Sequence, residues 1–195
     1  MPKRISADSR RSGAVLSQTP VRVAIVTLDS HMASAVDRAR VILKKELPGL
    51  TLSLHAVAEW GTDASAPERC RADIATADIV VASMMFLEEH IKVVEPWLLE
   101  RRETCDAVVG CLSAAEIVKM TRIGDFRMDK PTGGALGFLK RLRGKSGKSG
   151  SASRGQMKML RQLPKILKFI PGKAQDLRAY FLTLQYLLAD SDENV

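Results

Sequence analysis

Asp29, Ser30 and His31 are the first residues whose types and placement could do chemistry. They directly follow the apolar run 21–28, and the turn that they form contains no glycine, so a dinucleotide-binding fingerprint is absent. Ligands of open α/β sheets nevertheless bind at the turn after such a strand, and His31 could serve as an acid, a base or a ligand. The alternative is that Asp29 and Ser30 cap the following helix, with Ser30 as N-cap, and that His31 is an ordinary loop residue.

The remaining histidines and the cysteines match no known site pattern. His55 falls in a predicted strand and His90 in a predicted helix, at spacings from each other and from the cysteines that are typical of no metal motif. The cysteines, Cys70, Cys105 and Cys111, are odd in number and include no Cys-X-X-Cys pair, which argues against a disulfide framework. We therefore predict buried, reduced thiols and no metal site.

Acidic residues surround His90 at the start of a predicted helix. Glu88, Glu89 and Glu95 could form a general acid–base group with this histidine. On an amphipathic helix, however, such residues usually form the face that is exposed to solvent. No catalytic residue is predicted from them.

The segment 144–150 reads Gly-Lys-Ser-Gly-Lys-Ser-Gly, which twice contains the last three residues of a phosphate-binding P-loop. That motif also needs a glycine five residues before the glycine of the triplet, where this chain has Leu139 and Leu142. Neither triplet follows a predicted strand. We therefore interpret the segment as a flexible basic linker and not as a nucleotide site.

The candidate residues after residue 20 must be positioned by alternating strands and helices. Apolar, β-branched runs predict strands at 21–28, 50–57, 79–83 and 107–112. Helical spacing of apolar residues predicts a helix between His31 and Pro48 and further helices at about 67–76, 88–102 and 114–120. The sequence therefore predicts an α/β fold, a doubly wound, flavodoxin- or Rossmann-like parallel sheet of about four or more strands, followed by a basic linker and C-terminal helices.

Composition indicates the kind of core and the compartment. Hydrophobic residues make up 46% of the 195 residues but aromatic residues only 5%, so the core must consist mainly of aliphatic side chains, which argues against an aromatic-rich binding module. No apolar run reaches the length of a membrane span, and no signal peptide is recognisable in the first twenty residues. We therefore expect a soluble, cytoplasmic protein.

Charge is distributed unevenly along the chain. The net charge is +8, but residues 119–173 contain fifteen Lys and Arg and two Asp, a local charge of +13, which leaves −5 for the rest. This basic stretch predicts an anionic partner, which could be a membrane face, a carboxylate ligand or an acidic protein. Nucleic acid is disfavoured because only Phe126, Phe138 and Phe169 could stack on bases there.

Within the basic stretch, Lys158, Arg161, Lys165 and Lys168 share one face of a predicted amphipathic helix. They lie about 200° around the helix from an apolar face. That apolar face consists of Leu160, Leu163, Leu167 and Ile170. The four basic residues are our candidates for contact with an anionic partner, including a membrane surface. A merely solvated basic face is the alternative.

The chain is predicted to divide into four segments. These are a disordered leader (1–20), an α/β domain (21–142), a flexible basic linker (143–155) and a helical segment (156–195) that leads into further domains. The last helix of the fourth segment carries a wide apolar stripe, which predicts burial against another element. The stripe consists of Leu177, Tyr180, Phe181, Leu184, Leu187 and Leu188.

Several stretches resemble the N-terminal domain of the large (H) subunit of magnesium chelatases. Within the α/β part they are Ala-Ser-Met-Met-Phe-Leu-Glu-Glu (82–89), Cys-Asp-Ala-Val-Val (105–109), Ala-Glu-Ile-Val-Lys-Met (115–120) and Gly-Asp-Phe (124–126). In the tail they are Leu-Pro-Lys-Ile-Leu-Lys-Phe-Ile-Pro (163–171), Lys-Ala-Gln-Asp (173–176) and Leu-Thr-Leu-Gln-Tyr (182–186). The resemblance covers residues 21–195, and the chains of that family are several times longer. It therefore implies that this chain is a fragment or truncation.

The resemblance implies a role in ATP-dependent insertion of Mg²⁺ into protoporphyrin IX, a step of chlorophyll and bacteriochlorophyll biosynthesis. In that family two smaller AAA+-type subunits handle the ATP and the large subunit holds the porphyrin. Because metal insertion is attributed to later domains, the present segment is expected to be auxiliary and inactive alone. Its expected role is to shape the large subunit and to contact substrate or partner subunits, and no cofactor is assigned to it. No catalytic residue of the family maps onto this sequence.

A second hypothesis comes from the residues alone. The chain could be a stand-alone flavodoxin-like regulatory or ligand-binding domain, whose ligand lies at the edge after the strands and whose basic helix contacts a membrane. The third hypothesis is a peripheral membrane or nucleic-acid binder that uses the basic helix, and nucleic acid is the weaker of these two options.

Overall fold

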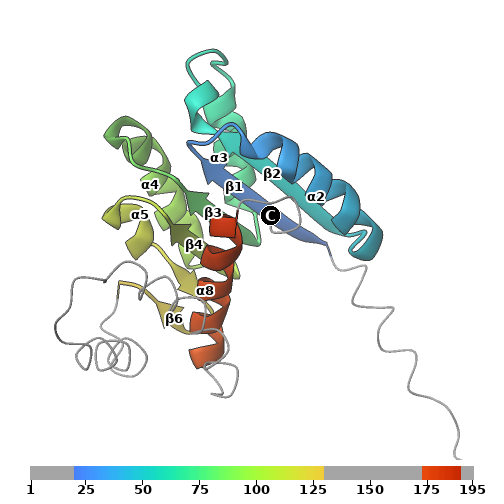
Figure 1. Cartoon of the computed structure of the whole chain (residues 1–195). Coiled ribbons are helices and arrows are strands. Elements are labelled where there is room, and N and C mark those ends of the chain that lie inside the picture. Colours follow the sequence, from blue (N-terminus) through green and yellow to red (C-terminus); the bar gives the residue numbers. More distant parts are fainter. Residues whose placement is uncertain (1–19, 130–172, 190–195) are drawn as a thin grey trace, which may run out of the picture.

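The computed structural model describes residues 20–129 and 173–189 (Figure 1). In chain order the elements are β1 (Val21–Thr27), α2 (Met32–Glu46), β2 (Leu50–Ala56), the short 3-10 helix η1 (Val57–Glu59), α3 (Ala66–Thr76), β3 (Ile79–Ser83), α4 (Glu88–Arg102), β4 (Ala107–Cys111), α5 (Ala115–Lys119), β5 (Arg122–Ile123), β6 (Phe126–Arg127) and α8 (Lys173–Ala189). The predicted leader (1–20, apart from Pro20), the linker (143–155) and the basic helix lie outside the described residues. The predicted division into segments therefore stays a prediction.

The strands form one six-stranded sheet in the order β2-β1-β3-β4-β5-β6. β1 pairs in parallel with both β2 and β3, and β3 pairs in parallel with β4. The two short strands β5 and β6 continue the sheet as an antiparallel hairpin at its edge. The predicted α/β fold with a mainly parallel sheet is confirmed. The edge hairpin was not predicted, because its two-residue strands carry no periodic pattern.

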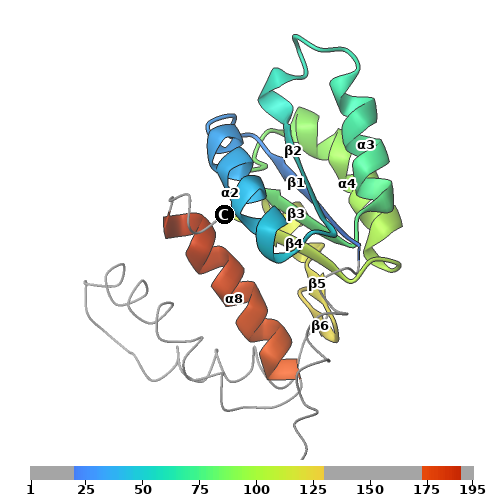
Figure 2. The ribbon, with the colours of Figure 1, turned by 90° about the vertical axis from the view of Figure 1, so that its right-hand side faces the viewer.

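Helices cover both faces of the sheet, as Figure 2 shows with α2 and α8 on one side and α3 and α4 on the other. The larger core cluster contains Ile74 of α3, Leu98 of α4 and Ile117 of α5, packed with strand residues such as Val26 and Val108. Alternate strand residues point to opposite faces, so the neighbours of these residues face α2 and α8. The strands are apolar on both faces because both faces are covered.

Helix α8 packs on the half of the sheet that contains β4, β5 and β6. Its Leu177 and Tyr180 are buried with Val109, Cys111 and Phe126. The Tyr180 hydroxyl donates a hydrogen bond to the Gly110 carbonyl oxygen of β4 over 3.4 Å, although the two residues are 70 apart in sequence. The prediction that the apolar stripe of the last helix is buried is therefore confirmed for Leu177 and Tyr180, and α8 is part of the same folded unit as the sheet.

Charged side chains fasten the edge hairpin to the end of α4. The guanidinium of Arg102, whose side chain is only 7% exposed, contacts both carboxylate oxygens of Asp129 over 2.9 and 2.8 Å. This guanidinium holds the pKa of Asp129 below its usual value. Arg122 donates to the Arg102 carbonyl oxygen over 2.6 Å, and Arg127 pairs with Glu103, whose pKa it lowers. A buried arginine is thereby supplied with a partner from the residues that follow β6.

Gly110 provides a test of how tightly α5 packs on β4. A Cβ at this buried position would collide with the backbone carbonyl of Ile117. Gly110→Ala should therefore lower the free energy of unfolding by about 1–3 kcal/mol. The matched control is Gly61→Ala, because a Cβ there would meet no atom within 4 Å and should change stability by less than about 0.5 kcal/mol. Urea denaturation of both variants checks the prediction, and equal effects would contradict it.

The Arg102–Asp129 pair should make stability depend on pH. Because the folded-state pKa of Asp129 is lowered, its ionised form stabilises the fold above its ordinary pKa, and this stabilisation is lost as the pH falls from about 4 towards the folded-state value. We expect Asp129→Asn to cost about 1–3 kcal/mol at pH 7 and progressively less below pH 4. The measurement is denaturant unfolding at several pH values.

The control for this prediction is Asp37→Asn, which removes an exposed ion pair with Arg40. Exposed pairs of this kind contribute at most about 0.5 kcal/mol, so this variant should stay close to the parent at every pH. A cost of Asp129→Asn that is equal at pH 3 and pH 7 would show that the ion pair is not its cause.

Candidate functional site

The strand order creates a topological switch point at the carboxyl ends of β1 and β3. The chain leaves β1 through α2 towards β2 on one side and leaves β3 through α4 towards β4 on the other. The loops after these neighbouring strands therefore diverge, and in open α/β sheets ligands bind at such a point. The residues concerned are 28–31 after β1 and 84–87 after β3.

Asp29 holds the turn after β1 in place. Its carboxylate accepts a hydrogen bond from the backbone N–H of His31 over 2.8 Å, and its own N–H donates to the Thr27 hydroxyl over 3.1 Å. Helix α2 begins at Met32 with His31 as N-cap and with no side-chain cap. The prediction of Ser30 as N-cap is therefore wrong, because Asp29 folds the turn on itself and delays the start of the helix.

The three predicted contact residues thus lie together at the carboxyl end of β1. Asp29 and Ser30 are half-buried and His31 is exposed, so the histidine is the most accessible of the three. The carboxylate of Asp29 is engaged by the turn, whereas no hydrogen bond of the Ser30 hydroxyl or of the His31 ring occurs among the described contacts. The arrangement can bind or orient a polar group.

Ser83, at the end of β3, is a residue that sequence reasoning missed. It lies in register with Thr27 of β1 and Cys111 of β4, on the face that α2 and α8 cover. Its side chain is fully buried, and its hydroxyl has no hydrogen-bond partner among the described residues. Such a group is costly unless something bonds to it. The only signal in the sequence is a serine at the end of an otherwise apolar strand.

The other titratable residues do not join this site. His55 pairs with Asp73 over 2.8 Å, and His90 packs edge-on against Trp60 with 5.9 Å between the ring centroids. In residues 20–129 and 173–189, no three His, Cys, Asp or Glu side chains are grouped so that they could hold a metal ion. Glu88 and Glu89 are exposed, as expected for a solvated helix face.

The three cysteines are free and buried, as predicted. Burial raises the pKa of Cys111 to about 12. Burial, with a smaller contribution from the Asp73 carboxylate, also raises the pKa of Cys70 to about 12. Both therefore remain thiols at neutral pH, where the nucleophilic thiolate does not form.

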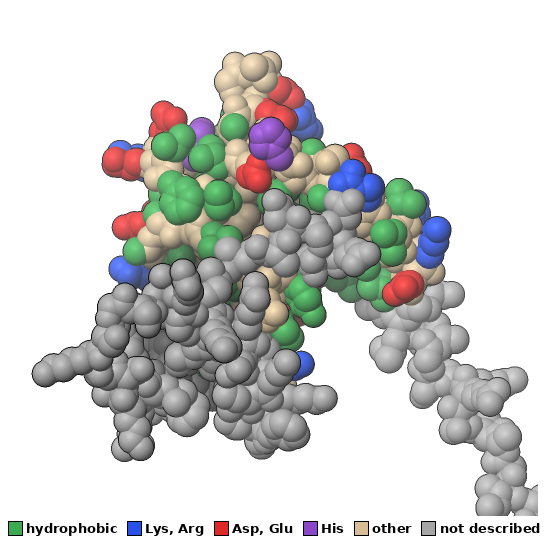
Figure 3. All heavy atoms as spheres, viewed as in Figure 1, with side chains coloured by type: hydrophobic (Ala, Val, Ile, Leu, Met, Phe, Trp, Pro, Cys, Tyr) green, Lys and Arg blue, Asp and Glu red, His purple; other side chains and the backbone are tan. Residues whose placement is uncertain are grey.

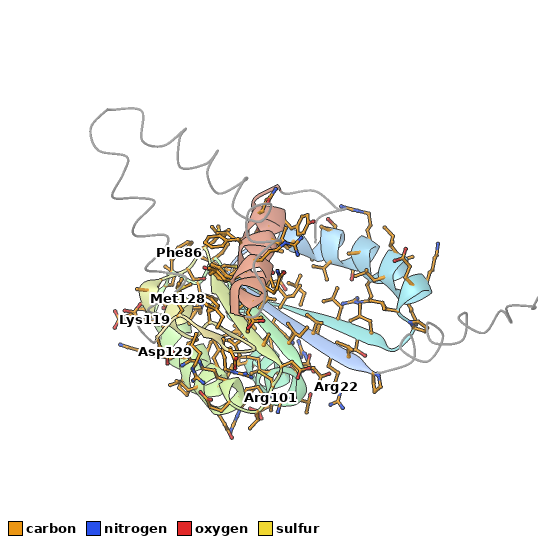
Figure 4. All side chains as sticks on the ribbon, turned by 90° about the horizontal axis from the view of Figure 1, so that it is seen from below. Arg22, Phe86, Arg101, Lys119, Met128 and Asp129 are labelled. Carbon is orange, nitrogen blue, oxygen red and sulfur yellow. The ribbon has the colours of Figure 1, made fainter. Side chains whose placement is uncertain are left out.

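A cleft of about 310 Å³ lies between α3 and α4, and none of residues 28–31 or 84–87 lines it. Its lining is mixed and comprises Arg71, Ile74, Ala75, Trp97, Glu100, Arg101 and Thr104. Arg101 is already engaged there, since it donates to the Ala77 carbonyl oxygen over 2.9 Å. In Figure 4 Arg101 and Arg22 lie together on the side of the molecule opposite Phe86, the loop residue after β3. The cleft is thus separate from the switch point after β1 and β3.

The predicted anionic-partner contacts lie outside the described residues. Lys158, Arg161, Lys165 and Lys168 therefore receive no structural placement. Among the described residues, no helix is long and apolar enough to cross a membrane.

Comparison with known proteins gives the same relationship as the sequence resemblance. A protein-family model described as "Domain of unknown function (DUF3479)" matches residues 22–181. The chain is 50% identical over 173 residues to the magnesium-chelatase H subunit of Cereibacter sphaeroides and 43% identical over 173 residues to that of Rhodobacter capsulatus, in both cases over 89% of this chain. A rice protein, the chloroplastic ChlH subunit of magnesium chelatase, is 30% identical over 90% of the chain.

The aligned region is a small part of each of these relatives. It covers 14% of the Cereibacter protein, 15% of the Rhodobacter protein and 13% of the rice protein. The resemblance to the large subunit of magnesium chelatases is confirmed over most of this chain. Because the family model covers most of the sequence, the chain belongs to the DUF3479 domain family, and it is similar to a segment of the large subunits of magnesium chelatases.

Proposed function

We propose that this chain is an auxiliary segment of a magnesium-chelatase large subunit, the porphyrin-holding component of an enzyme that inserts Mg²⁺ into protoporphyrin IX with ATP. The observation that carries the proposal is the 50% identity over 89% of the chain to the large subunit of a magnesium chelatase. Similarity at this level across the whole folded unit supports a shared role and not only a shared fold. The stand-alone regulatory domain is less well supported, because the relatives from Cereibacter, Rhodobacter and rice are all much longer proteins.

The described residues support an auxiliary role within that enzyme. They contain no cluster suited to Mg²⁺, and the pKa values of Cys70 and Cys111 are raised far above neutrality. No step of metal insertion is therefore assigned to this segment. The two AAA+-type subunits, as partners, follow from the resemblance, and a peripheral membrane contact follows from the basic stretch; both are part of the proposal.

Within the proposal, the sheet edge after β1 and β3 is the place where the segment contacts substrate or partner subunits. Asp29, Ser30 and His31 border it on one side, and the buried hydroxyl of Ser83 lies at the end of the neighbouring strand. A bound polar group could supply the hydrogen bond that Ser83 lacks among the described residues. This assignment rests on position in the sheet and on the chemistry of these four side chains.

The chelatase role predicts a difference between the isolated chain and the complete polypeptide. With Mg²⁺, ATP, protoporphyrin IX and both AAA+-type subunits, the isolated 195-residue chain should form no magnesium protoporphyrin, since it offers no ligand cluster among its described residues. The complete polypeptide that contains this segment should form it under the same conditions. Product formation is followed by the fluorescence of the metallated porphyrin.

Two results would refute the proposed role. Turnover by the isolated chain above a blank without protein would show that the segment is itself catalytic. A complete polypeptide that folds but does not insert Mg²⁺ when both AAA+-type subunits are supplied would contradict the chelatase assignment.

Ser83 gives a test that separates stability from function. Ser83→Ala removes a buried hydroxyl without a described partner and should leave the free energy of unfolding unchanged or raise it by up to about 1 kcal/mol. The matched control is Thr27→Val, because Thr27 is in register with Ser83. This variant lacks the hydroxyl that accepts a hydrogen bond from the Asp29 N–H, so its free energy of unfolding should fall by about 0.5–1.5 kcal/mol. If Ser83 contacts substrate or a partner, Ser83→Ala in the complete polypeptide should still lower the rate of magnesium insertion.

Denaturant unfolding and the insertion assay together check this prediction. Destabilisation by Ser83→Ala equal to that of Thr27→Val would mean that the hydroxyl is bonded in the folded chain. If a stable Ser83→Ala variant inserts magnesium at an unchanged rate, Ser83 does not belong to the contact site.

A further inference from the structure

The loop after β3 exposes large apolar side chains to solvent. Met84, Phe86 and Leu87 are 37%, 53% and 45% exposed, whereas Met85 between them is buried in the main core. We refer to residues 84–87 as the apolar loop. Figure 4 shows Phe86 at the border of the molecule, and Figure 3 shows hydrophobic side chains beside acidic ones over the side where α4 and α5 lie. One buried methionine thus anchors a loop that presents three apolar groups outward.

Hydrogen bonds hold the apolar loop in a defined shape. The Met84 N–H donates to the Leu112 carbonyl oxygen over 3.1 Å, and the Ala114 N–H donates to the Met85 carbonyl oxygen over 2.8 Å. The Met85 N–H donates to the hydroxyl of Ser113 over 3.1 Å, and that hydroxyl donates to the Cys111 carbonyl oxygen. The loop after β3 is therefore clamped to the loop after β4.

This shape requires unfavourable backbone conformations. Met84 has a φ of 58° and Leu112 a φ of 48°, in the left-handed region that residues with a side chain rarely adopt. Residues of this kind cluster where a protein binds a ligand or a partner. Because the loop is already ordered, a partner that covers it loses little conformational entropy on binding.

Other exposed apolar residues differ from this group. Val41 and Ile42 are 62% and 52% exposed, but they belong to the regular helix α2. Leu99 stands apart near the end of α4. Exposed apolar side chains that lie on a regular helix or stand alone are ordinary, whereas three within four residues of a constrained loop indicate an interface.

The border of the apolar loop is acidic. Glu88 and Glu89 begin α4 immediately after it, and Glu116 lies in the first turn of α5, all with exposed side chains. Lys92 offsets Glu88, with which it pairs over 2.7 Å. A surface that fits this loop would therefore be apolar at its centre and would carry Lys or Arg at its rim.

We propose that residues 84–87 are a docking surface for another region of the same, longer polypeptide, an apolar surface bordered by Lys and Arg. This inference rests on the proposed function, in which the chain is one segment of a large subunit. The occupant is identified by length and charge. The chain corresponds to 14% of the Cereibacter relative, so most of such a polypeptide lies outside this segment and is joined to it, and the acidic border favours a basic rim.

Hydroxyl-radical footprinting of the complete polypeptide tests the proposal, because the oxidation of a side chain reports its exposure. Relative to the isolated chain, oxidation of Met84 and Phe86 should fall at least about tenfold, whereas that of Val41 and Ile42 should change by less than about twofold, as expected for a core contact that excludes water. Equal oxidation of Met84 in the two proteins would overturn the proposal.

Paired double variants test whether the loop itself makes the contact. In the complete polypeptide, Phe86→Ser with Leu87→Ser should restore the oxidation of Met84 towards the level of the isolated chain. The matched control, Val41→Ser with Ile42→Ser, should leave Met84 protected. If Met84 stays protected from oxidation in the loop variant, the proposal is overturned. It is also overturned if Met84 is already protected in the isolated chain and loses this protection on dilution, because a second copy would then be the occupant.

Footprinting needs no turnover, so its failure is distinguishable from failure of the proposed function. An exposed Met84 in a complete polypeptide that inserts Mg²⁺ would refute the docking surface alone. A protected Met84 in a polypeptide that does not insert Mg²⁺ would support the docking surface while the chelatase assignment fails.

Discussion

Strand β4 is buried along its whole length, and the rest of the structure depends on covering both of its faces. On one face Val108 packs with α4 and α5, and on the other Val109 and Cys111 pack with α8. Gly110 lies between these layers, where its carbonyl oxygen accepts hydrogen bonds from the hydroxyls of Thr121 and Tyr180. The absence of a side chain lets α5 approach, while the backbone polar groups are satisfied by elements far apart in sequence. Residues of α8 are therefore needed to cover the second face of β4.

Much of this architecture could be predicted from the sequence, because the main strands and helices carry strong periodic patterns. The parallel strands are apolar throughout, and polar turns separate them from the helices, so their positions and order along the chain follow directly. The edge hairpin could not be predicted in this way, since β5 and β6 have two residues each and are held by Arg122, Arg127 and the Arg102–Asp129 pair. These interactions depend on side chains that meet only in the folded chain.

The candidate site was predictable only in part, for a related reason. The position of the turn at Asp29 could be predicted because the turn follows the first strand. The N-cap of α2 could not, because it depends on which hydrogen bonds the side chains of the turn make. The Asp29 carboxylate accepts a hydrogen bond from the His31 N–H, and His31, not Ser30, is the N-cap. Ser83 could not be identified, because its importance comes from its register with Thr27 and Cys111 and from the burial that α2 and α8 impose. Periodicity reports which face a residue occupies, not which polar atoms lack a partner there.

The carboxyl edge of the sheet therefore combines two kinds of surface that call for different partners. The turn after β1 offers a carboxylate, a hydroxyl and an imidazole, which suit a polar ligand, whereas the clamped loop after β3 offers three apolar side chains, which suit another protein surface. Both lie at the same edge because β1 and β3 are neighbouring parallel strands whose connections diverge there.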